Sequence, residues 1–364
     1  ACSGDVTRMQ SRRRAGRADP SSTRGRSEPG PVDSTERWMW MPQPGVVTSI
    51  PSATPIPLLR ATELTHSTRS IRRGEMVPVL RGVYAAASDW HPLPRWERDL
   101  ARVHAHLLRH PDAVLCLESA ALVWGLPVVG QIDAVHVLAS DTATSRRVSG
   151  VRVHTSAHSD RVVEERGGIL LTSPADTCID IARLRHPAAG LVTADAAIRR
   201  GSAAAAALGA LNEDRASARG RRQARWALAR ADGAAESALE SVSRAAAEWW
   251  GFPAPELQRW IGSSDDDGDR TDMWWPDIRV AGEADGHLKY DGRFGDPGAA
   301  LRAREERDRR LRRHGARTVA HWSWADVAEP SGLRDILLSA GLTPNSVPDL
   351  HRLSGLGRLL RAEG

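Results

Sequence analysis

Lysine is almost absent from this chain of 364 residues, since Lys289 is the only lysine among 50 lysine and arginine residues. The three cysteines, Cys2, Cys116 and Cys178, lie far apart, and their number and spacing exclude a disulfide framework and a Cys-x-x-Cys metal knuckle. No run of about 20 uncharged apolar residues is present, which argues against a membrane span and a membrane partner. Together these absences favour a protein of the reducing cytoplasm.

The residues that are present indicate a folded chain with more than one unit. Hydrophobic residues make up 41% of the chain and glycines number 31, so about half of it is apolar, the usual share in globular proteins. The length is roughly twice that of an ordinary domain and predicts two or three compact units. The net charge is +5. Because arginine is frequent throughout, its abundance alone is weak evidence for nucleic-acid binding.

The first 45 residues are rich in Arg, Ser, Pro and Gly and show no apolar periodicity. They contain no hydrophobic segment of the kind that a secretory signal requires. We expect residues 1–45 to form a disordered tail.

Residues 46–88 are expected to form a winged helix-turn-helix. Residues 58–64 favour a short helix, and residues 68–73 favour a second helix that ends at Gly74. Residues 77–84 then favour a β-hairpin with a basic tip. Helix, turn, basic helix and hairpin is the order of a winged helix, whose second helix lies in the major groove of DNA.

Four arginines of this unit are candidates for DNA contact: Arg69, Arg72 and Arg73 on one helix face, and Arg81 at the hairpin tip. Arginine suits both the guanine edge and the phosphate backbone, so DNA is the expected partner. The alternative is a helix and a hairpin that pack together while their arginines remain solvated.

The hairpin sequence Leu80-Arg81-Gly82-Val83-Tyr84 resembles the N-terminal winged helix of the abortive-infection type IV antitoxin family, AbiEi-like. Shorter matches follow at Glu118-Ser119-Ala120-Ala121, at Trp124-Gly125-Leu126 and at residues 171–177. The resemblance implies DNA binding, autoregulation and a cognate toxin as a second partner.

Residues 89–211 are expected to form an α/β middle domain that serves as a scaffold. The patterns favour helices over residues 96–110, 115–124, 174–183 and 191–200, and strands over residues 134–138 and 151–154. In the third of these helices, Asp176 can act as a cap or pair with an arginine. The arginine-rich residues 212–231 are expected to form a basic linker helix, which either tracks phosphates or is simply solvated.

Residues 232–328 carry the strongest chemical signal. A helix is expected over residues 234–250, with Asp232 as its cap and Glu240 on the flank of its apolar stripe. Beyond it, residues 299–314 favour a charged helix that ends at Gly315, residues 318–322 favour a strand, and residues 323–327 favour a short helix.

Between these helices, two β-rich runs separated by Pro276-Asp277 favour a hairpin. With these two residues as the loop, Asp272 opposes Ala281, and Asp272, Glu283 and Asp285 share one face. Asp272 and Glu283 then become diagonal neighbours within about 8 Å. Two carboxylates at that distance repel each other unless a divalent cation lies between them.

Oxygen-rich sites of this kind suit Mg²⁺ or Mn²⁺, which can activate a water for attack on a phosphoryl group. Asp272 and Glu283 are therefore the expected metal-binding pair, and Glu240 can add a third carboxylate. Lys289 lies four residues beyond Asp285 and can orient the water or offset charge in the transition state. The alternative is that the Gly-Glu-x-Asp-Gly sequence is only a polar strand end and turn.

The chain also resembles a second family, at Glu240-Ser241, at Asp272, at Gly282-Glu283-x-Asp285-Gly286-x-x-Lys289-Tyr290 and at Arg307-Asp308-x-x-Leu311-Arg312-x-x-Gly315. This actinobacterial domain family is related to very-short-patch-repair endonucleases, which have the PD-(D/E)XK restriction-endonuclease-like fold. The resemblance implies that Asp272 and Glu283 bind the metal and that Glu240 is the helix carboxylate. Asp285 stands where that superfamily usually has its catalytic lysine, and Lys289 is the displaced candidate.

The expected fold is therefore mixed α/β and multi-domain: a winged helix-turn-helix, an α/β middle domain, a restriction-endonuclease-like domain and a C-terminal extension over residues 329–364. The expected function is that of a DNA-binding protein with a metal-dependent endonuclease-like domain that hydrolyses phosphodiesters. The alternative is a non-enzymatic, antitoxin-like transcriptional regulator that keeps only a degenerate nuclease fold.

Overall fold

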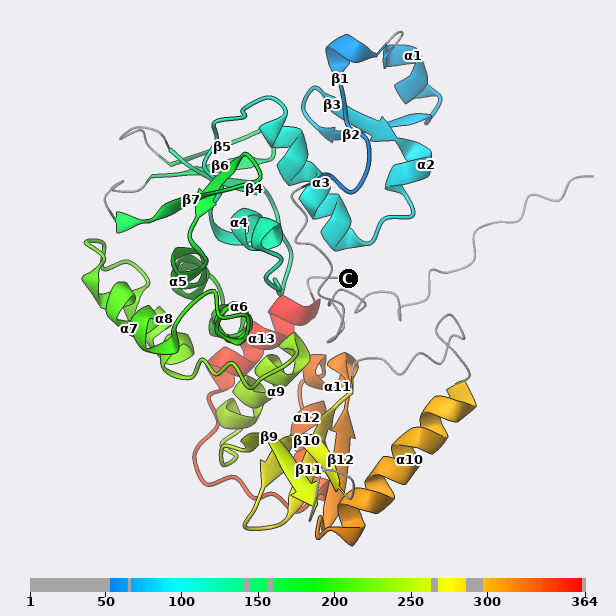
Figure 1. Ribbon diagram of the computed structural model, residues 1–364, viewed down its shortest axis with the longest axis vertical. Coiled ribbons are helices and arrows are strands. Elements are labelled where there is room, and N and C mark those ends of the chain that lie inside the picture. Colours follow the sequence, from blue (N-terminus) through cyan, green and yellow to red (C-terminus); the bar gives the residue numbers. More distant parts are fainter. Residues whose placement is uncertain are drawn as a thin grey trace, which may run out of the picture. The chain divides into compact units, whose positions relative to one another are not determined.

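The computed structural model describes residues 53–64, 67–139, 145–155, 160–262, 268–285 and 297–361. All of these ranges belong to the unit of residues 37–364. They form a mixed α/β structure with several small sheets, which confirms the mixed α/β part of the predicted fold class (Figure 1). None of the helices in these ranges has the length and apolar character needed to cross a bilayer. The predicted tail, residues 1–45, and Lys289 lie outside the described residues.

The first described segment forms a three-stranded sheet in the order β1-β3-β2. Its elements are β1 (Leu59–Arg60), a 3₁₀ turn (Ala61–Glu63), α1 (Ser67–Arg72), β2 (Met76–Leu80), β3 (Val83–Ala86) and α2 (Ala87–Trp90). The hairpin of β2 and β3 confirms the predicted one. The predicted helix over residues 58–64 is wrong, because Leu59 and Arg60 pair with β3 as an edge strand.

The middle segment contains two further sheets, ordered β4-β6-β5 and β7-β8, and a group of helices. Its elements are α3 (Arg95–Leu107), α4 (Leu117–Trp124), β4 (Val135–Leu138), β5 (Arg146–Val148), β6 (Val151–His154), β7 (Val163–Arg166), β8 (Ile169–Thr172), α5 (Pro174–Leu184), α6 (Pro187–Arg199), α7 (Ala205–Asp214) and α8 (Arg221–Ala229). Three of the four helices predicted for this segment agree with α3, α4 and α5 to within three residues at each end.

Helix α6 is the exception, because it begins at Pro187 and not at residue 191. Proline fits the first turn of a helix, where its missing N–H costs nothing. Gly190 lies inside the helix against α5. A Cβ on Gly190 would come within 2.6 Å of the Ala182 Cα, so this glycine allows the two helices to pack closely.

The arginine-rich residues 212–231 are not a solvated linker, contrary to expectation. Arg215 is buried, and its guanidinium lies 2.7 Å from a carboxylate oxygen of Asp176 and also contacts Asp180. Trp226 and Leu228 of α8 belong to the same apolar core as α5 and α6. The segment is therefore part of the core, because Arg215 pairs with buried acids and the apolar face of α8 packs against neighbouring helices.

The last segment contains a four-stranded sheet in the order β12-β11-β10-β9. Its elements are α9 (Ala238–Trp249), β9 (Glu256–Gly262), β10 (Gly268–Trp275), β11 (Val280–Ala284), α10 (Pro297–Arg313), β12 (Thr318–Trp322), α11 (Trp324–Ala328), α12 (Gly332–Ser339) and α13 (Leu350–Arg361). Strands β9, β10 and β11 are antiparallel neighbours, and β12 runs parallel to β11. The predicted order of helix, hairpin, helix and strand is present.

Two boundaries in this segment differ from the prediction. Ser237, and not Asp232, caps α9, because its hydroxyl accepts a hydrogen bond from the backbone N–H of Glu240. The predicted C-terminal extension, residues 329–364, contains α12 and α13, whose Leu337 and Leu360 are buried in the core. It is therefore part of the packed structure.

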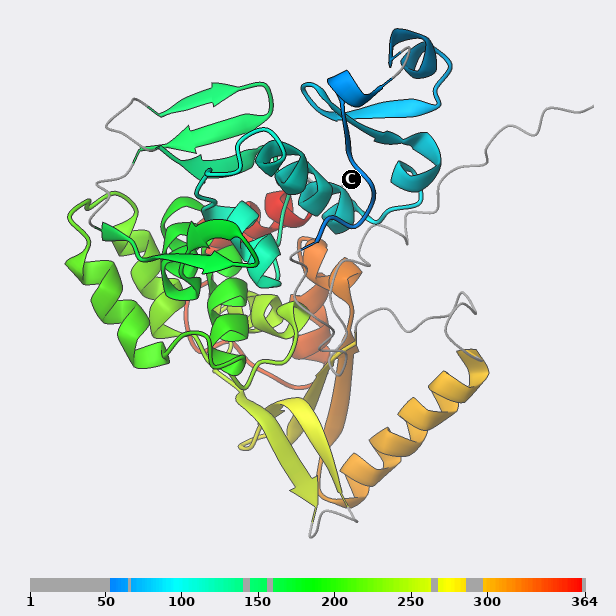
Figure 2. The ribbon, with the colours of Figure 1, turned by 45° about the horizontal axis from the view of Figure 1, so that its top comes forward.

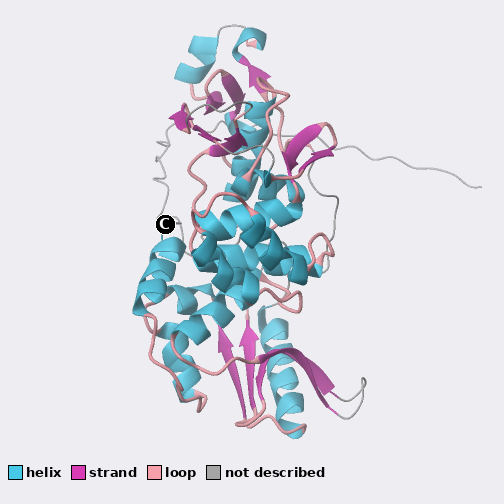
Figure 3. Ribbon diagram, turned by 90° about the vertical axis from the view of Figure 1, so that its left-hand side faces the viewer, coloured by secondary structure: helices cyan, strands magenta, loops and turns pink. Residues whose placement is uncertain are grey.

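The four-stranded sheet has one helix layer on each face. Met273, Trp275 and Trp322 belong to the core that includes α9, and the indole N–H of Trp322 donates to Ser243 of that helix. The alternate residues Trp274 and Ala281 pack with Leu311 of α10. Figures 2 and 3 show α10 alongside this sheet. The side chains of alternate residues, among them Asp272 and Glu283, consequently face α10.

Candidate active site

The β10–β11 hairpin brings Asp272 next to Glu283 on one face, one position beyond the last paired residues, Met273 and Gly282. Its loop contains four residues, from Pro276 to Arg279, because Trp275 pairs with Val280 and Met273 pairs with Gly282. The predicted two-residue loop, and with it the pairing of Asp272 with Ala281, is wrong. The shift is by two residues, however, so Asp272 and Glu283 still share one face and have become direct neighbours.

Asp272 is held by neighbours on both sides. One carboxylate oxygen accepts the backbone N–H of Ala284 at 2.9 Å, and the other accepts the side-chain amide of Gln258 at 3.3 Å. Gln258 lies on β9, where its backbone has a φ of 52°, in the left-handed region that few side chains adopt. Burial raises the pKa of Asp272, because it disfavours the charged form.

Glu240 joins this group from the first turn of α9. It is 4% exposed. Its Oε2 accepts the side-chain amide of Gln258 at 2.9 Å and the backbone N–H of Glu236 at 2.8 Å. One amide nitrogen of Gln258 thus donates to both Glu240 and Asp272. Burial, and then the neighbouring charge of Asp272, raise the pKa of Glu240 to about 7.

Glu283 is the most buried of the three carboxyls, with 2% exposure. Its Oε2 lies 2.9 Å from the guanidinium of Arg307 on α10, whereas Oε1 is buried and has no hydrogen-bond partner within the described ranges. Burial and the nearby Asp272 raise the pKa of Glu283 to about 8, against the opposing effect of Arg307. The cluster therefore attracts protons or a further cation.

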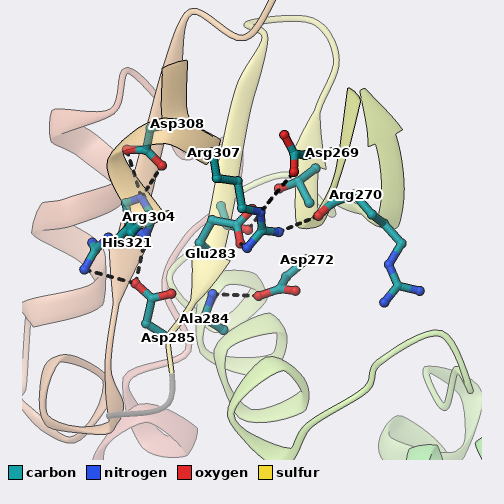
Figure 4. Close-up of polar contacts among 12 residues, drawn as sticks. Asp269, Arg270, Asp272, Glu283, Ala284, Asp285, Arg304, Arg307, Asp308 and His321 are labelled. Carbon is teal, nitrogen blue, oxygen red and sulfur yellow. Dashed lines mark hydrogen bonds and ion pairs between the residues drawn. The ribbon is translucent and has the colours of Figure 1, made fainter. Parts of the chain in front are cut away.

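A second polar group adjoins the first on the next strand. His321 of β12 is the register partner of Glu283. Its Nδ1 lies 2.8 Å from Asp285 and its Nε2 lies 3.0 Å from Asp308 of α10 (Figure 4). Both ring nitrogens can donate to these carboxylates at once only when the ring carries two protons. The predicted residue Asp285 thus contacts His321 and, at 3.3 Å, Arg304.

Sequence reasoning did not assign a role to Gln258, His321, Arg304 or Arg307. The only sequence signal for His321 was its place between apolar residues of a strand. The structure places it opposite Glu283. Gln258 gave no signal at all, because its contact with Glu240 and Asp272 depends on an unusual backbone conformation in β9. Lys289 cannot be placed, since it lies outside the described residues.

The four predicted DNA-binding arginines lie in the first segment and are exposed. Arg69 and Arg72 occupy the last turn of α1, and Arg73 follows the helix, where it lies 3.7 Å from Glu75. Arg81 stands in the turn between β2 and β3, next to Gly82, which has a φ of 78°. No group of three or more His, Cys, Asp or Glu in the described ranges has the arrangement of a ready metal site.

Comparison with known proteins identifies relatives of this chain. It is 36% identical over 216 residues to the uncharacterized protein Rv2248 of Mycobacterium tuberculosis strain H37Rv, and equally to the uncharacterized protein MT2308 of strain CDC 1551. The aligned part is 58% of this chain and 74% of each relative. The chain belongs to their family. No family model and no solved structure matches it. The names of these family members carry no activity, so function is argued from the residues.

Proposed function

We propose that this protein is a cytoplasmic DNA-binding protein with a metal-dependent endonuclease-like domain that hydrolyses phosphodiesters. The observation that carries the proposal is the proximity of Asp272 and Glu283 on one sheet face, with Glu240 joined to Asp272 through Gln258. Two buried carboxyls, Glu240 and Glu283, beside the partly buried Asp272 are costly unless they serve a charged partner.

The chemistry of these residues, although not yet the arrangement of three of them in the described ranges, suits a divalent cation. Glu283 keeps one buried oxygen without a hydrogen-bond partner in the described ranges, and the pKa values of Glu240 and Glu283 are raised. Asp272 and Glu283 would hold Mg²⁺ or Mn²⁺, and Glu240 would assist them, because these ions prefer carboxylate oxygens. When bound, such an ion lowers the pKa of a water and offsets charge on a phosphoryl oxygen.

The exposed arginines of the first segment support contact with DNA. Arg69 and Arg72 share the last turn of α1, and Arg81 stands on the adjoining hairpin turn. A basic helix followed by a basic hairpin suits a helix in the major groove and a hairpin on the phosphate backbone. This part of the proposal treats the segment as a winged helix-turn-helix.

One observation favours the second candidate, a non-enzymatic regulator of the antitoxin type. Arg307 already forms an ion pair with Glu283 at 2.9 Å. A guanidinium in this position neutralises part of the acidic cluster, so the cluster can persist in a domain that has lost catalysis. Such a protein would bind its own promoter, and a cognate toxin would be its partner.

Plasmid cleavage in Mn²⁺ separates the two functions. The comparison uses wild-type protein, Asp272→Asn, which keeps the side-chain shape, and Asp277→Asn as a control on the exposed turn of the same hairpin. Cleavage that survives Asp277→Asn and is lost in Asp272→Asn supports the endonuclease. Promoter binding in a gel shift, without nicking at any Mn²⁺ concentration, supports the regulator and contradicts the first proposal.

A further inference from the structure

Two arginines of α10 reach the acidic face of the sheet. Arg304 and Arg307 are three residues apart and therefore lie on the same side of the helix. Arg307 contacts Glu283 at 2.9 Å, and Arg304 contacts Asp285 at 3.3 Å (Figure 4). The helix that covers the acidic face thus supplies a row of positive charge parallel to the row of acids on β11.

These arginines bridge the buried acids and the solvent. The side chain of Arg307 is 37% exposed, whereas that of Glu283 is 3% exposed. The side chain of Arg304 is 29% exposed. Both guanidinium groups are therefore accessible to a ligand that approaches from solvent, although Glu283 behind Arg307 is not.

The Arg307 guanidinium and a divalent cation would compete for Glu283. If Asp272 and Glu283 hold a divalent cation, repulsion between the two positive charges weakens the contact of Arg307 with Glu283. The released guanidinium remains beside the cation, where its planar set of N–H donors matches the oxygens of a phosphate. Arg304, one turn away, can contact the same phosphate or the next one along the strand.

We propose that Arg304 and Arg307 bind the phosphodiester of the substrate, and that they act as counter-ions of Asp285 and Glu283 until a divalent cation binds. The inference rests on the proposed function, since it names the residues of that same site that recognise the substrate. It assigns to α10 a role in substrate binding that is separate from the DNA contacts of the first segment.

Other arginines of α10 provide the matched control. Arg309 carries the same charge on the same helix, but its side chain is 64% exposed and pairs with Glu305 one turn earlier. Arg309→Gln therefore removes one positive charge without touching the acidic face. Arg307→Lys keeps the charge but loses the planar set of donors, so it separates charge from geometry.

In the first measurement, calorimetry determines the affinity of the full chain for Mn²⁺ without DNA. We expect Arg307→Gln to bind Mn²⁺ about tenfold more tightly than wild type, because the competing cation is gone. Arg307→Lys and Arg309→Gln should remain within about twofold of wild type. An unchanged or weaker Mn²⁺ affinity in Arg307→Gln contradicts the counter-ion role.

In the second measurement, a thymidine dinucleotide binds to the Mn²⁺-loaded protein. The broadening of the phosphorus NMR signal of the dinucleotide measures this binding. This ligand carries one phosphodiester and is too short to engage a helix-turn-helix. We expect Arg307→Gln and Arg307→Lys to weaken dinucleotide binding about tenfold, Arg304→Gln to weaken it by a smaller factor, and Arg309→Gln to leave it unchanged. Inorganic phosphate as a second ligand shows whether a diester is preferred.

The outcomes separate this inference from the proposed function. Wild-type protein that binds no Mn²⁺ overturns both. Wild-type protein that binds Mn²⁺ and cleaves DNA, with dinucleotide binding unaffected by Arg304→Gln and Arg307→Gln, overturns only the role of the arginines. Tighter Mn²⁺ binding together with weaker dinucleotide binding in a single variant supports the inference, and loss of fold cannot produce that combination.

Discussion

Asp272 on β10 and Glu283 on β11 share one face of the hairpin, next to the Met273–Gly282 pair, although 11 positions separate them in the sequence. Gln258 on one side and Arg307 on the other contact the two carboxyls. Burial raises the pKa of Glu283, and the nearby charge of Asp272 raises it further. The cost of ionising Glu283 leads to testable consequences.

The stability of the protein should fall as the pH rises from 7.5 to 8.5 in the presence of a chelator. The pKa of Glu240 is raised to about 7 and that of Glu283 to about 8, so the folded state holds protons that the unfolded state has already released. The unfolded state binds fewer protons throughout this window, and the free energy of unfolding therefore decreases with pH. Urea denaturation at several pH values measures the slope, which Glu283→Gln should flatten.

Histidines do not obscure this window. The pKa values of His106, His154 and His186 are lowered to about 4 by burial, so these rings are neutral above pH 7.5 in the folded state and, with an ordinary pKa of about 6.5, largely so in the unfolded state. Their contribution has the opposite sign, a stability that increases as the pH rises towards about 7.5. An equal slope in wild type and Glu283→Gln between pH 7.5 and 8.5 would contradict the assignment to Glu283.

Mn²⁺ should raise the melting temperature more at pH 8 than at pH 6. Binding to the folded state stabilises it, and the carboxyls must lose their protons before they can bind the ion. Differential scanning fluorimetry with and without chelator measures the shift. We expect Asp272→Asn to abolish it and Asp277→Asn to retain it. A shift of the same size in Asp272→Asn would place the ion elsewhere.

Arg215→Ala should destabilise the middle segment strongly. Its guanidinium is the buried partner of Asp176 and Asp180, so the substitution leaves buried carboxylates with less positive charge, at a cost of about 3–5 kcal/mol. Urea denaturation measures this loss. Arg225→Ala, which breaks an exposed pair with Glu213, should leave the free energy of unfolding nearly unchanged.

Gly282→Ala should destabilise the four-stranded sheet. A Cβ at this position would come within 2.5 Å of the Trp322 ring and 2.9 Å of the Trp275 ring. Overpacking of this kind costs about 1–3 kcal/mol. The same substitution at Gly209 in α7 meets no atom within 4 Å and should stabilise its helix slightly. Thermal denaturation of the two variants tests the comparison, and equal melting temperatures would count against the packing argument.

Replacement of Arg69 and Arg72 by Gln should weaken DNA binding and its salt dependence. Each phosphate contact that is lost reduces the slope of log affinity against log salt by about one unit. Fluorescence anisotropy with a duplex at several salt concentrations measures the slope. Arg334→Gln, a change at an exposed arginine of α12, is the control. An unchanged slope would favour the packing role of the first segment over the DNA-binding one.

The sequence predicted much of the last segment because its signals are local. Alternating side chains placed Asp272 and Glu283 on one face of a hairpin, and that parity survived a wrong loop length because the error was two residues. The loop length was not predicted because Arg279 adopts a positive φ of 54°, a backbone conformation that an arginine in the sequence does not predict. The interpretation of residues 212–231 failed because an arginine-rich segment is expected to be exposed to solvent unless its acidic partners are known.

Composition and periodicity by themselves determined the mixed α/β class, the hairpins and the shared face of the acidic pair, since each depends on neighbours within a few positions. Only the tertiary structure decided which groups meet that pair: Gln258 from β9, Glu240 from α9, His321 from β12 and Arg307 from α10. The physical reason is that burial and charge compensation depend on atoms brought together across the fold, and spacing along the chain does not encode them.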